Sequence, residues 1–198
     1  GSFFSQEIPQ VLVPVQAYLT RGVGTHPEEL VAFEIALRDA GIAAQNLVTV
    51  SSILPPRCEL ISREQGERTL QSGQILHVVM SREETDEPHR LVGASIGIAR
   101  PREADRHGFI AEHGGFGHDE TELRAHAEDL AATMLASTLG IDVDPALSAS
   151  ERAGQLTGSG AIELTDSIAA TAHGDPRGWT TCVVAACVFV MEWMLPAR

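Results

Sequence analysis

The feature that most constrains the fold of this chain is an apolar run that ends at two serines. Two prolines follow shortly after them. Residues 46–50 read Asn-Leu-Val-Thr-Val, a pattern rich in β-branched residues that predicts a strand. Ser51 and Ser52 follow directly, and Pro55 and Pro56 prevent the strand from continuing. We therefore expect the chain to leave a sheet at a serine turn, with the prolines restricting the arm beyond it.

The remaining pattern predicts strands and helices that are segregated along the chain. Strands are expected at residues 11–19, 75–81, 91–99, 109–112, 162–172 and 180–192, and helices at 27–41 and 119–140. Gly22 and Gly24 predict a flexible loop, residues 82–90 a turn, and residues 142–160 a polar surface excursion. Segregated elements of this kind predict an α+β layered sandwich, formed as a single domain over residues 1–198.

Charge and cysteine content limit the classes of partner. The net charge is −13, from 14 basic and 27 acidic residues, which argues against nucleic acid as the main partner. Cys58, Cys182 and Cys187 have no metal-like spacing, so we predict reduced thiols in a cytoplasmic protein and no metal site. We expect no signal peptide, and the longest apolar run, residues 183–191, is too short to span a membrane.

The adjacent serines permit a self-cleavage reaction. If the hydroxyl group of Ser52 attacks the carbonyl carbon of Ser51, the peptide bond becomes an ester. β-Elimination then releases Ser51 as a new carboxyl terminus and leaves dehydroalanine, which hydrolyses with loss of ammonia to a pyruvoyl group. This reaction is helped by a strained turn that holds the Ser51 carbonyl group in place. An ordinary serine turn is the commoner explanation of such a motif, so the motif alone does not decide the question.

Several segments together closely resemble the pyruvoyl-dependent arginine decarboxylases. They are Ser52-Ile53-Leu54-Pro55-Pro56, Ala32-Phe33-Glu34, Asn46-Leu47-Val48, Ser95-Ile96-Gly97-Ile98-Ala99, Ile110-Ala111-Glu112-His113, Ala127-Glu128-Asp129-Leu130-Ala131 and Trp179-Thr180-Thr181. The resemblance implies a layered αββα sandwich with two central, mainly antiparallel sheets. It also implies cleavage between Ser51 and Ser52, a covalent pyruvoyl cofactor derived from Ser52, and a homotrimer of cleaved αβ subunits with active sites between neighbours. The implied reaction converts L-arginine to agmatine and carbon dioxide through a Schiff base.

Glu112 and Asn46 are the further catalytic candidates. Glu112 ends an apolar strand, where half-burial should raise the pKa of its carboxyl group. The resemblance implies that this acid protonates the substrate carbanion and takes part in processing. It also places Asn46 beside the pyruvoyl group, whereas sequence alone favours a strand-start residue that bonds local backbone.

Substrate binding is assigned to Glu34, Leu37 and Ile53. The resemblance implies that an acid at position 34 faces the cationic end of the substrate, where a carboxylate can hold a guanidinium group through two hydrogen bonds. Without the resemblance, Glu34 would be a solvated residue of an amphipathic helix. Leu37, one turn later, would line the aliphatic part of the substrate. Glu128 and Asp129 on the long helix are expected to be exposed.

Two alternatives remain open. The same chemistry could act on lysine or ornithine, or the chain could be an unprocessed family member with a structural or regulatory role. The sequence also leaves open whether the physiological role is polyamine supply or acid resistance.

Overall fold

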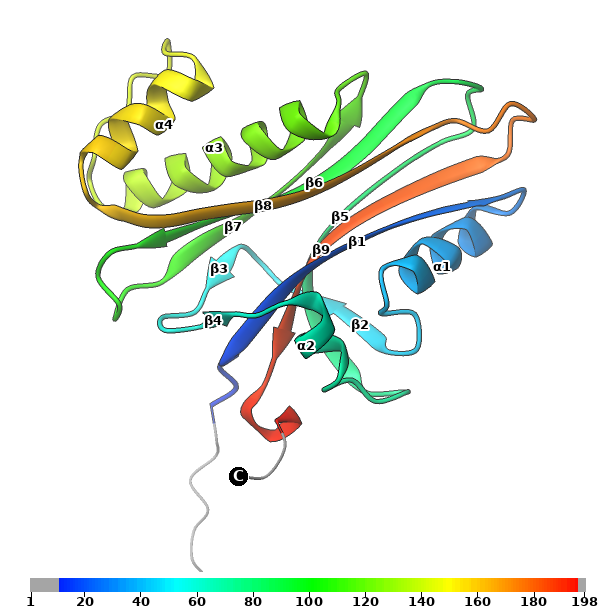
Figure 1. The fold of residues 1–198 in the computed structure, drawn as a ribbon, viewed down its shortest axis with the longest axis horizontal. Coiled ribbons are helices and arrows are strands. Elements are labelled where there is room, and N and C mark those ends of the chain that lie inside the picture. Colours follow the sequence, from blue (N-terminus) through cyan, green and yellow to red (C-terminus); the bar gives the residue numbers. More distant parts are fainter. Residues whose placement is uncertain (1–10, 196–198) are drawn as a thin grey trace, which may run out of the picture.

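Two sheets packed face to face form the centre of the molecule, and helices lie on their outer faces (Figure 1). The computed structural model describes residues 11–195. Its elements are β1 (Gln16–His26), α1 (Glu29–Asp39), β2 (Asn46–Thr49), β3 (Ile53–Leu54), β4 (Glu59–Leu60), α2 (Arg63–Glu67), β5 (Ile75–Thr85), β6 (Leu91–Pro101), β7 (Gly108–Phe116), α3 (Glu120–Thr138), α4 (Ala149–Gly158), β8 (Ile162–His173), β9 (Thr180–Val190) and the 3-10 turn η1 (Glu192–Met194). None of the helices among these residues is long and apolar enough to cross a membrane.

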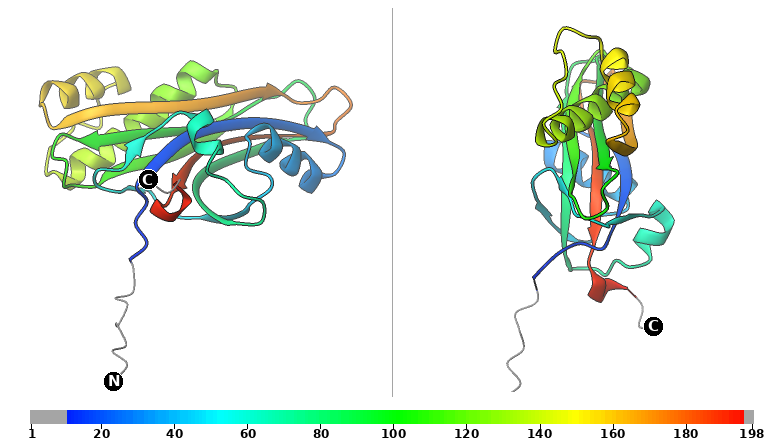
Figure 2. Two further views of the ribbon diagram at one scale, coloured as in Figure 1. Left: turned by 60° about the horizontal axis from the view of Figure 1, so that its bottom comes forward. Right: turned by 90° about the vertical axis from the view of Figure 1, so that its left-hand side faces the viewer.

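The sheets are mainly antiparallel. The first has the strand order β2-β5-β9-β1-β4 and the second β3-β7-β6-β8. Only the short strands β2 and β4 pair in parallel, with β5 and β1 respectively. The predicted α+β layered sandwich with two central sheets is therefore confirmed. α1 and α4 lie at opposite ends of the molecule, as Figure 2 also shows.

Strand β9 is buried on both faces and separates two cores. Val183 and Cys187 point into the core between the sheets, whereas Cys182 and Val184 point into the core beneath α1. This alternation follows from the period-two geometry of a strand, and it places Cys182 and Cys187 on opposite faces of β9. All three cysteines are buried and unpaired.

Glycines let helix backbones lie directly on the sheets. A Cβ atom at Gly22 would lie 2.0 Å from the carbonyl oxygen of Ala36, and one at Gly97 would lie 2.2 Å from that of Ala127. Side chains at these positions would push α1 off β1 and α3 off β6. The predicted flexible loop at Gly22 and Gly24 is therefore wrong, because both glycines lie inside strand β1.

A buried ion pair fixes α4 to α3. The guanidinium group of Arg152 donates to both carboxylate oxygens of Asp129, at 3.1 and 2.6 Å, and to the carbonyl oxygens of Pro145 and Leu147. Asp129 is 5% exposed, so the prediction that it lies on the surface is wrong. Arg152 thus fixes the loop and the helix of residues 142–160 to α3, and the buried side chain of Leu156 packs against the same helix.

Candidate active site

The Ser51–Ser52 peptide lies where the chain crosses from one sheet to the other. β2 is an edge strand of the first sheet, and β3, which begins one residue after Ser52, is an edge strand of the second. On one side, the backbone N–H of Val50 donates to the carbonyl oxygen of Val78 at 2.9 Å. On the other, the N–H of Ile110 donates to the carbonyl oxygen of Ser52 at 2.8 Å. The Ser51–Ser52 peptide bond is therefore held between two hydrogen-bonded residues, one on each sheet.

These two anchors, rather than a strained turn, position the serines. Among the described non-glycine residues, a positive φ occurs at Arg57 and His89, and no described peptide bond is cis. The expected strain at Ser51 and Ser52 is therefore absent from the φ angles. Ser51 is exposed and Ser52 is half-buried, so the Ser51 carbonyl group lies near the surface rather than in the core.

A mainly apolar pocket of about 380 Å³ opens beside Ser51. Its walls come from the residues around the serines, from the ends of β5 and β9, and from the segment before β1. They are Val50, Ser51, Ile53, Pro55, Pro56, His77, Phe189, Met191, Leu12, Val13 and Pro14. Ile53, predicted to bind substrate, lines this pocket and is 42% exposed. The pocket has the size and character needed for a short aliphatic chain.

Glu112 lies close to Ser52 along strand β7. It follows Ile110, whose N–H binds Ser52, by two residues, which is about 7 Å along a strand. Ile110 belongs to the core between the sheets, so Glu112 projects from the same face of β7. Its side chain is exposed in the single chain, however, so the predicted half-burial is wrong for the isolated subunit.

Two buried serines, neither of which was predicted to act at the site, fix the backbone next to Glu112. The hydroxyl groups of Ser81 and Ser95 both donate to the carbonyl oxygen of His113, at 2.9 and 3.0 Å. Ser81 belongs to β5 in the first sheet, and Ser95 to β6 in the second. These two bonds tie β7 to its neighbour β6 and to β5 of the facing sheet, which fixes the strand that carries Glu112.

Asn46 lies at the far end of β2 from the serines. Its side-chain N–H₂ donates to the carbonyl oxygen of Gly73 at 3.0 Å, and its backbone N–H donates to that of Gln74 at 2.8 Å. Six residues of extended chain separate it from Ser52, a span of up to about 20 Å. Within one chain Asn46 therefore has the local backbone role, and the structure does not bring it to Ser52.

Glu34 and Leu37 lie on α1, away from β3 (Figure 1). Leu37 is half-buried against the core beneath the helix. The carboxylate group of Glu34 is bound by Arg38, one turn further along the same helix. One subunit thus brings Ser51, Ser52, Ile53 and Glu112 together, and leaves Glu34 and Leu37 at a separate place.

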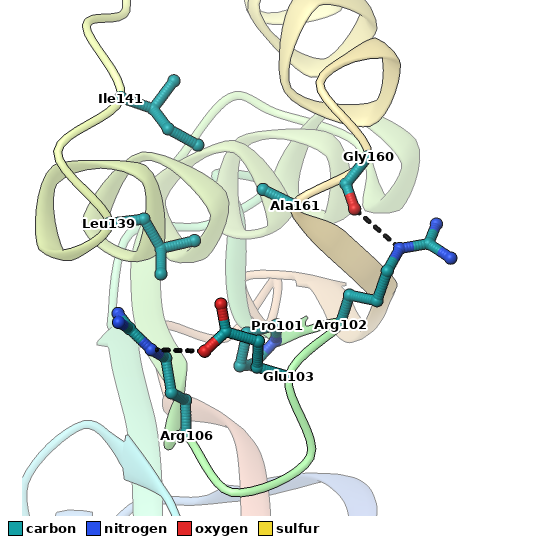
Figure 3. Close-up of a pocket in the computed structure, with 8 residues that line it drawn as sticks. All are labelled: Pro101, Arg102, Glu103, Arg106, Leu139, Ile141, Gly160 and Ala161. Atoms are coloured by element: carbon teal, nitrogen blue, oxygen red, sulfur yellow. Dashed lines mark hydrogen bonds and ion pairs between the residues drawn. The ribbon is translucent and has the colours of Figure 1, made fainter.

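A second hollow, of about 290 Å³, lies beside the turn between β6 and β7, at the end of the second sheet where β3 pairs with β7 (Figure 3). In it Arg106 pairs with Glu103 at 2.8 Å, and Arg102 donates to the carbonyl oxygen of Gly160 at 2.7 Å. None of the residues lining this hollow was predicted to act in the reaction. Within residues 11–195, no cluster of three or more histidine, cysteine, aspartate or glutamate side chains could hold a metal ion.

Comparison with known proteins gives a consistent result over nearly the whole chain. The family model described as pyruvoyl-dependent arginine decarboxylase matches residues 16–193. A protein of Methanosarcina acetivorans named pyruvoyl-dependent arginine decarboxylase 2 is 50% identical over 179 residues, covering 90% of this chain and 98% of that protein. A pyruvoyl-dependent arginine decarboxylase of Nitrosopumilus maritimus is 47% identical over 180 residues, covering 90% and 98%. A probable pyruvoyl-dependent arginine decarboxylase of Chlorobium phaeovibrioides is 49% identical over 174 residues, covering 88% and 96%.

Proposed function

Because the chain belongs to the family of pyruvoyl-dependent arginine decarboxylases, we propose that it is a self-processing enzyme that converts L-arginine to agmatine and carbon dioxide. The observation that carries this proposal is the Ser51–Ser52 peptide held between the edges of two sheets, beside an apolar pocket and near Glu112. An ordinary serine turn does not need anchors in two different sheets.

Processing uses groups that belong to the chain itself. The Ser52 hydroxyl oxygen attacks the Ser51 carbonyl carbon, and the peptide C–N bond breaks as the ester C–O bond forms. Loss of the Cα proton of residue 52 then breaks its Cβ–O bond, so Ser51 leaves with a free carboxylate and residue 52 becomes dehydroalanine. Hydrolysis of dehydroalanine consumes one water molecule, releases ammonia and leaves the ketone. The hydrogen bond from Ile110 to the Ser52 carbonyl group holds the new amino-terminal residue in place after cleavage.

The residues around Ser52 fit a ketone group formed at that position. A pyruvoyl group supplies a carbonyl carbon that condenses with the substrate amine and accepts the electron pair released by decarboxylation. The sequence contains no lysine, since all 14 of its basic residues are arginines. No side-chain primary amine therefore competes with the substrate for the ketone.

Four side chains are assigned to the substrate. Glu112 delivers the proton to the substrate α-carbon, Glu34 binds the guanidinium group, and Leu37 and Ile53 line the methylene chain. Asn46 would act from a site close to residue 52. Since α1 and the start of β2 lie away from Ser52 in one chain, these roles require a neighbouring subunit.

We propose that this neighbour is supplied by a homotrimer of cleaved subunits. The surface around the cleavage site exposes several large apolar side chains, which a free monomer would leave in water. They are Leu12, Val13, Val48, Val50 and Ile53. Burial of this surface against α1 of a second copy would join the two halves of the site and desolvate Glu112.

We also propose that the protein works in the cytoplasm. Its three cysteines are buried and unpaired, which suits a reducing compartment.

An intact mass spectrum of the denatured protein tests the proposal. We expect two chains, residues 1–51 and a pyruvoyl-headed 52–198, in wild type and in Ser51→Ala, which keeps the nucleophile. Ser52→Ala should remain one chain. The cleaved enzyme should release carbon dioxide from arginine far faster than from lysine, because a single ammonium group cannot match the planar fork of a guanidinium group. A single uncut wild-type chain, or no carbon dioxide from arginine, would contradict the proposal.

A further inference from the structure

The carboxylate group assigned to the substrate already holds a guanidinium group from its own helix. Arg38 Nε donates to Oε1 of Glu34 at 3.2 Å, and Arg38 Nη2 donates to Oε2. Both carboxylate oxygens are therefore engaged by one planar fork. Among the described residues, the side-chain partner of the Arg38 guanidinium group is Glu34, and this hydrogen bonding raises the pKa of Arg38.

This pairing has the geometry expected for the substrate. A guanidinium group binds a carboxylate best through two parallel N–H···O bonds, and arginine as a substrate would offer the same fork as Arg38. If both guanidinium groups approached one carboxylate, one positive charge would remain without a partner. The substrate guanidinium group would therefore compete with Arg38 for the single negative charge of Glu34.

Arg38 can leave, because little else restrains it. Its side chain is 68% exposed and lies in the last turn of α1. Arg82 shows the contrast, since it stacks on the ring of Phe33 at 4.0 Å and pairs with Glu84 at 2.9 Å. Arg38 is therefore placed to exchange with a ligand, whereas Arg82 is held by an aromatic ring and by carboxylate groups.

We propose that Arg38 is an internal competitor for the substrate guanidinium group, which occupies Glu34 in the empty site and releases it when arginine binds. This inference rests on the proposed assignment of Glu34 to the cationic end of the substrate. Arg38 is thus a residue that sets the affinity for substrate and takes no part in the chemical step. Its removal should strengthen ground-state binding and leave kcat unchanged.

The test measures binding of n-butylguanidine to the purified, cleaved enzyme by calorimetry. This probe carries the guanidinium group and the aliphatic chain but no α-amine, so it reports on the cation site without reaction at residue 52. Arg38→Met, which keeps an aliphatic side chain and removes the donors, should lower the Kd by about two- to fivefold, the range for loss of an exposed ion pair. The KM for arginine should fall by the same factor at constant kcat. Arg38→Lys, which offers one point charge, should give an intermediate Kd.

Arg68→Met is the matched control. Arg68 pairs with Glu64 on α2 at the same spacing of four residues, and both side chains are well exposed. This variant should bind n-butylguanidine as wild type does. The inference is overturned if Arg38→Met binds the probe with unchanged or weaker affinity, since Arg38 would then be inert or would position Glu34.

Glu34→Gln separates this inference from the proposed function. Loss of n-butylguanidine binding in that variant is expected. Unchanged binding would refute both the substrate assignment of Glu34 and the role of Arg38. The two-chain mass spectrum and carbon dioxide release from arginine would remain as independent measures of the enzyme's function.

Discussion

Gly24→Ala should separate substrate binding from self-cleavage, because it moves α1 and leaves the serines alone. A Cβ atom at Gly24 would lie 2.1 Å from the carbonyl oxygen of Ala32 and 2.5 Å from the backbone nitrogen of Ala36. Ordinary contact begins at 3.4 Å, so the helix must retreat from β1 by about 1.3 Å. α1 carries Glu34, whereas Ser51 and Ser52 are held by contacts in β5 and β7.

The size of the effect follows from this displacement. Overpacking of a close contact costs about 1–3 kcal/mol, and in a domain of this size each kcal/mol lowers the Tm by roughly 2–4 °C. We therefore expect the Tm to fall by about 2–12 °C. Displacement of a binding group by about 1 Å can cost up to about a hundredfold in kcat/KM, and here most of the loss should appear in KM for arginine.

Calorimetry measures the Tm, mass spectrometry measures the extent of cleavage, and initial rates give the KM for arginine. Gly154→Ala in α4 is the control of the same chemistry, because a Cβ atom there meets nothing within 4 Å and should slightly stabilise the helix. Both variants should be fully cleaved. If Gly24→Ala melts at the wild-type Tm with an unchanged KM, then α1 does not rest on the β1 backbone, and the reasoning fails.

Three further substitutions test the ion pair of α4, the contact between His113 on β7 and His126 on α3, and the link between the sheets. Arg152→Met should lower the Tm, because it leaves the buried carboxylate of Asp129 without its bidentate partner, and it should expose residues 142–158 to limited proteolysis. Burial and the neighbouring imidazole of His126, whose ring centroid lies 4.2 Å away, lower the pKa of His113. The unfolded chain therefore takes up this proton first, and stability is lost as the pH falls below about 6.5; urea unfolding at pH 7.5 and 5.0 should show a smaller loss for His126→Gln. Ser81→Ala removes the bond that joins β5 to β7 and should cost about 1 kcal/mol in urea unfolding.

The controls for these variants differ. Arg106→Met breaks an exposed ion pair with Glu103 and should leave the Tm nearly unchanged. His107→Gln lies on the loop before β7 and should retain the wild-type pH dependence. A pH response of His126→Gln equal to that of wild type would show that the paired rings do not cause the acid sensitivity.

The long elements could be predicted because their pattern is local. The apolar run of β9 and the periodicity of α3 each reflect burial repeated over many residues. β3 and β4 contain two residues each, too few for any periodicity, so neither strand could be predicted from the sequence. The crossing between the sheets was therefore visible only as a serine turn followed by prolines.

A common reason explains the wrong predictions of a loop at Gly22 and Gly24 and of an exposed side chain at Asp129. A glycine in a sequence suggests a loop, and an acid on a helix suggests a solvated face, because these are the usual surroundings of each residue. Here the backbone of a packed helix takes the place of the missing side chain, and Arg152 compensates the buried carboxylate. The α1 backbone and Arg152 each come from another part of the chain, so the sequence around the glycines and Asp129 does not predict these contacts.

The candidate site also has two parts, which differ in whether one chain brings their residues together. One backbone hydrogen bond, from Ile110 to Ser52, places the cleavage point on the strand that carries Glu112, so the processing part is built within a single chain. Glu34 stands on a helix seated on the outer face of the first sheet, and Asn46 is bonded to the loop before β5. One chain therefore carries Ser51, Ser52 and Glu112 near one another, and carries Glu34 and Asn46 at a distance from them. We therefore predict that a variant which loses the proposed contact between copies is still cleaved between Ser51 and Ser52 but does not bind arginine.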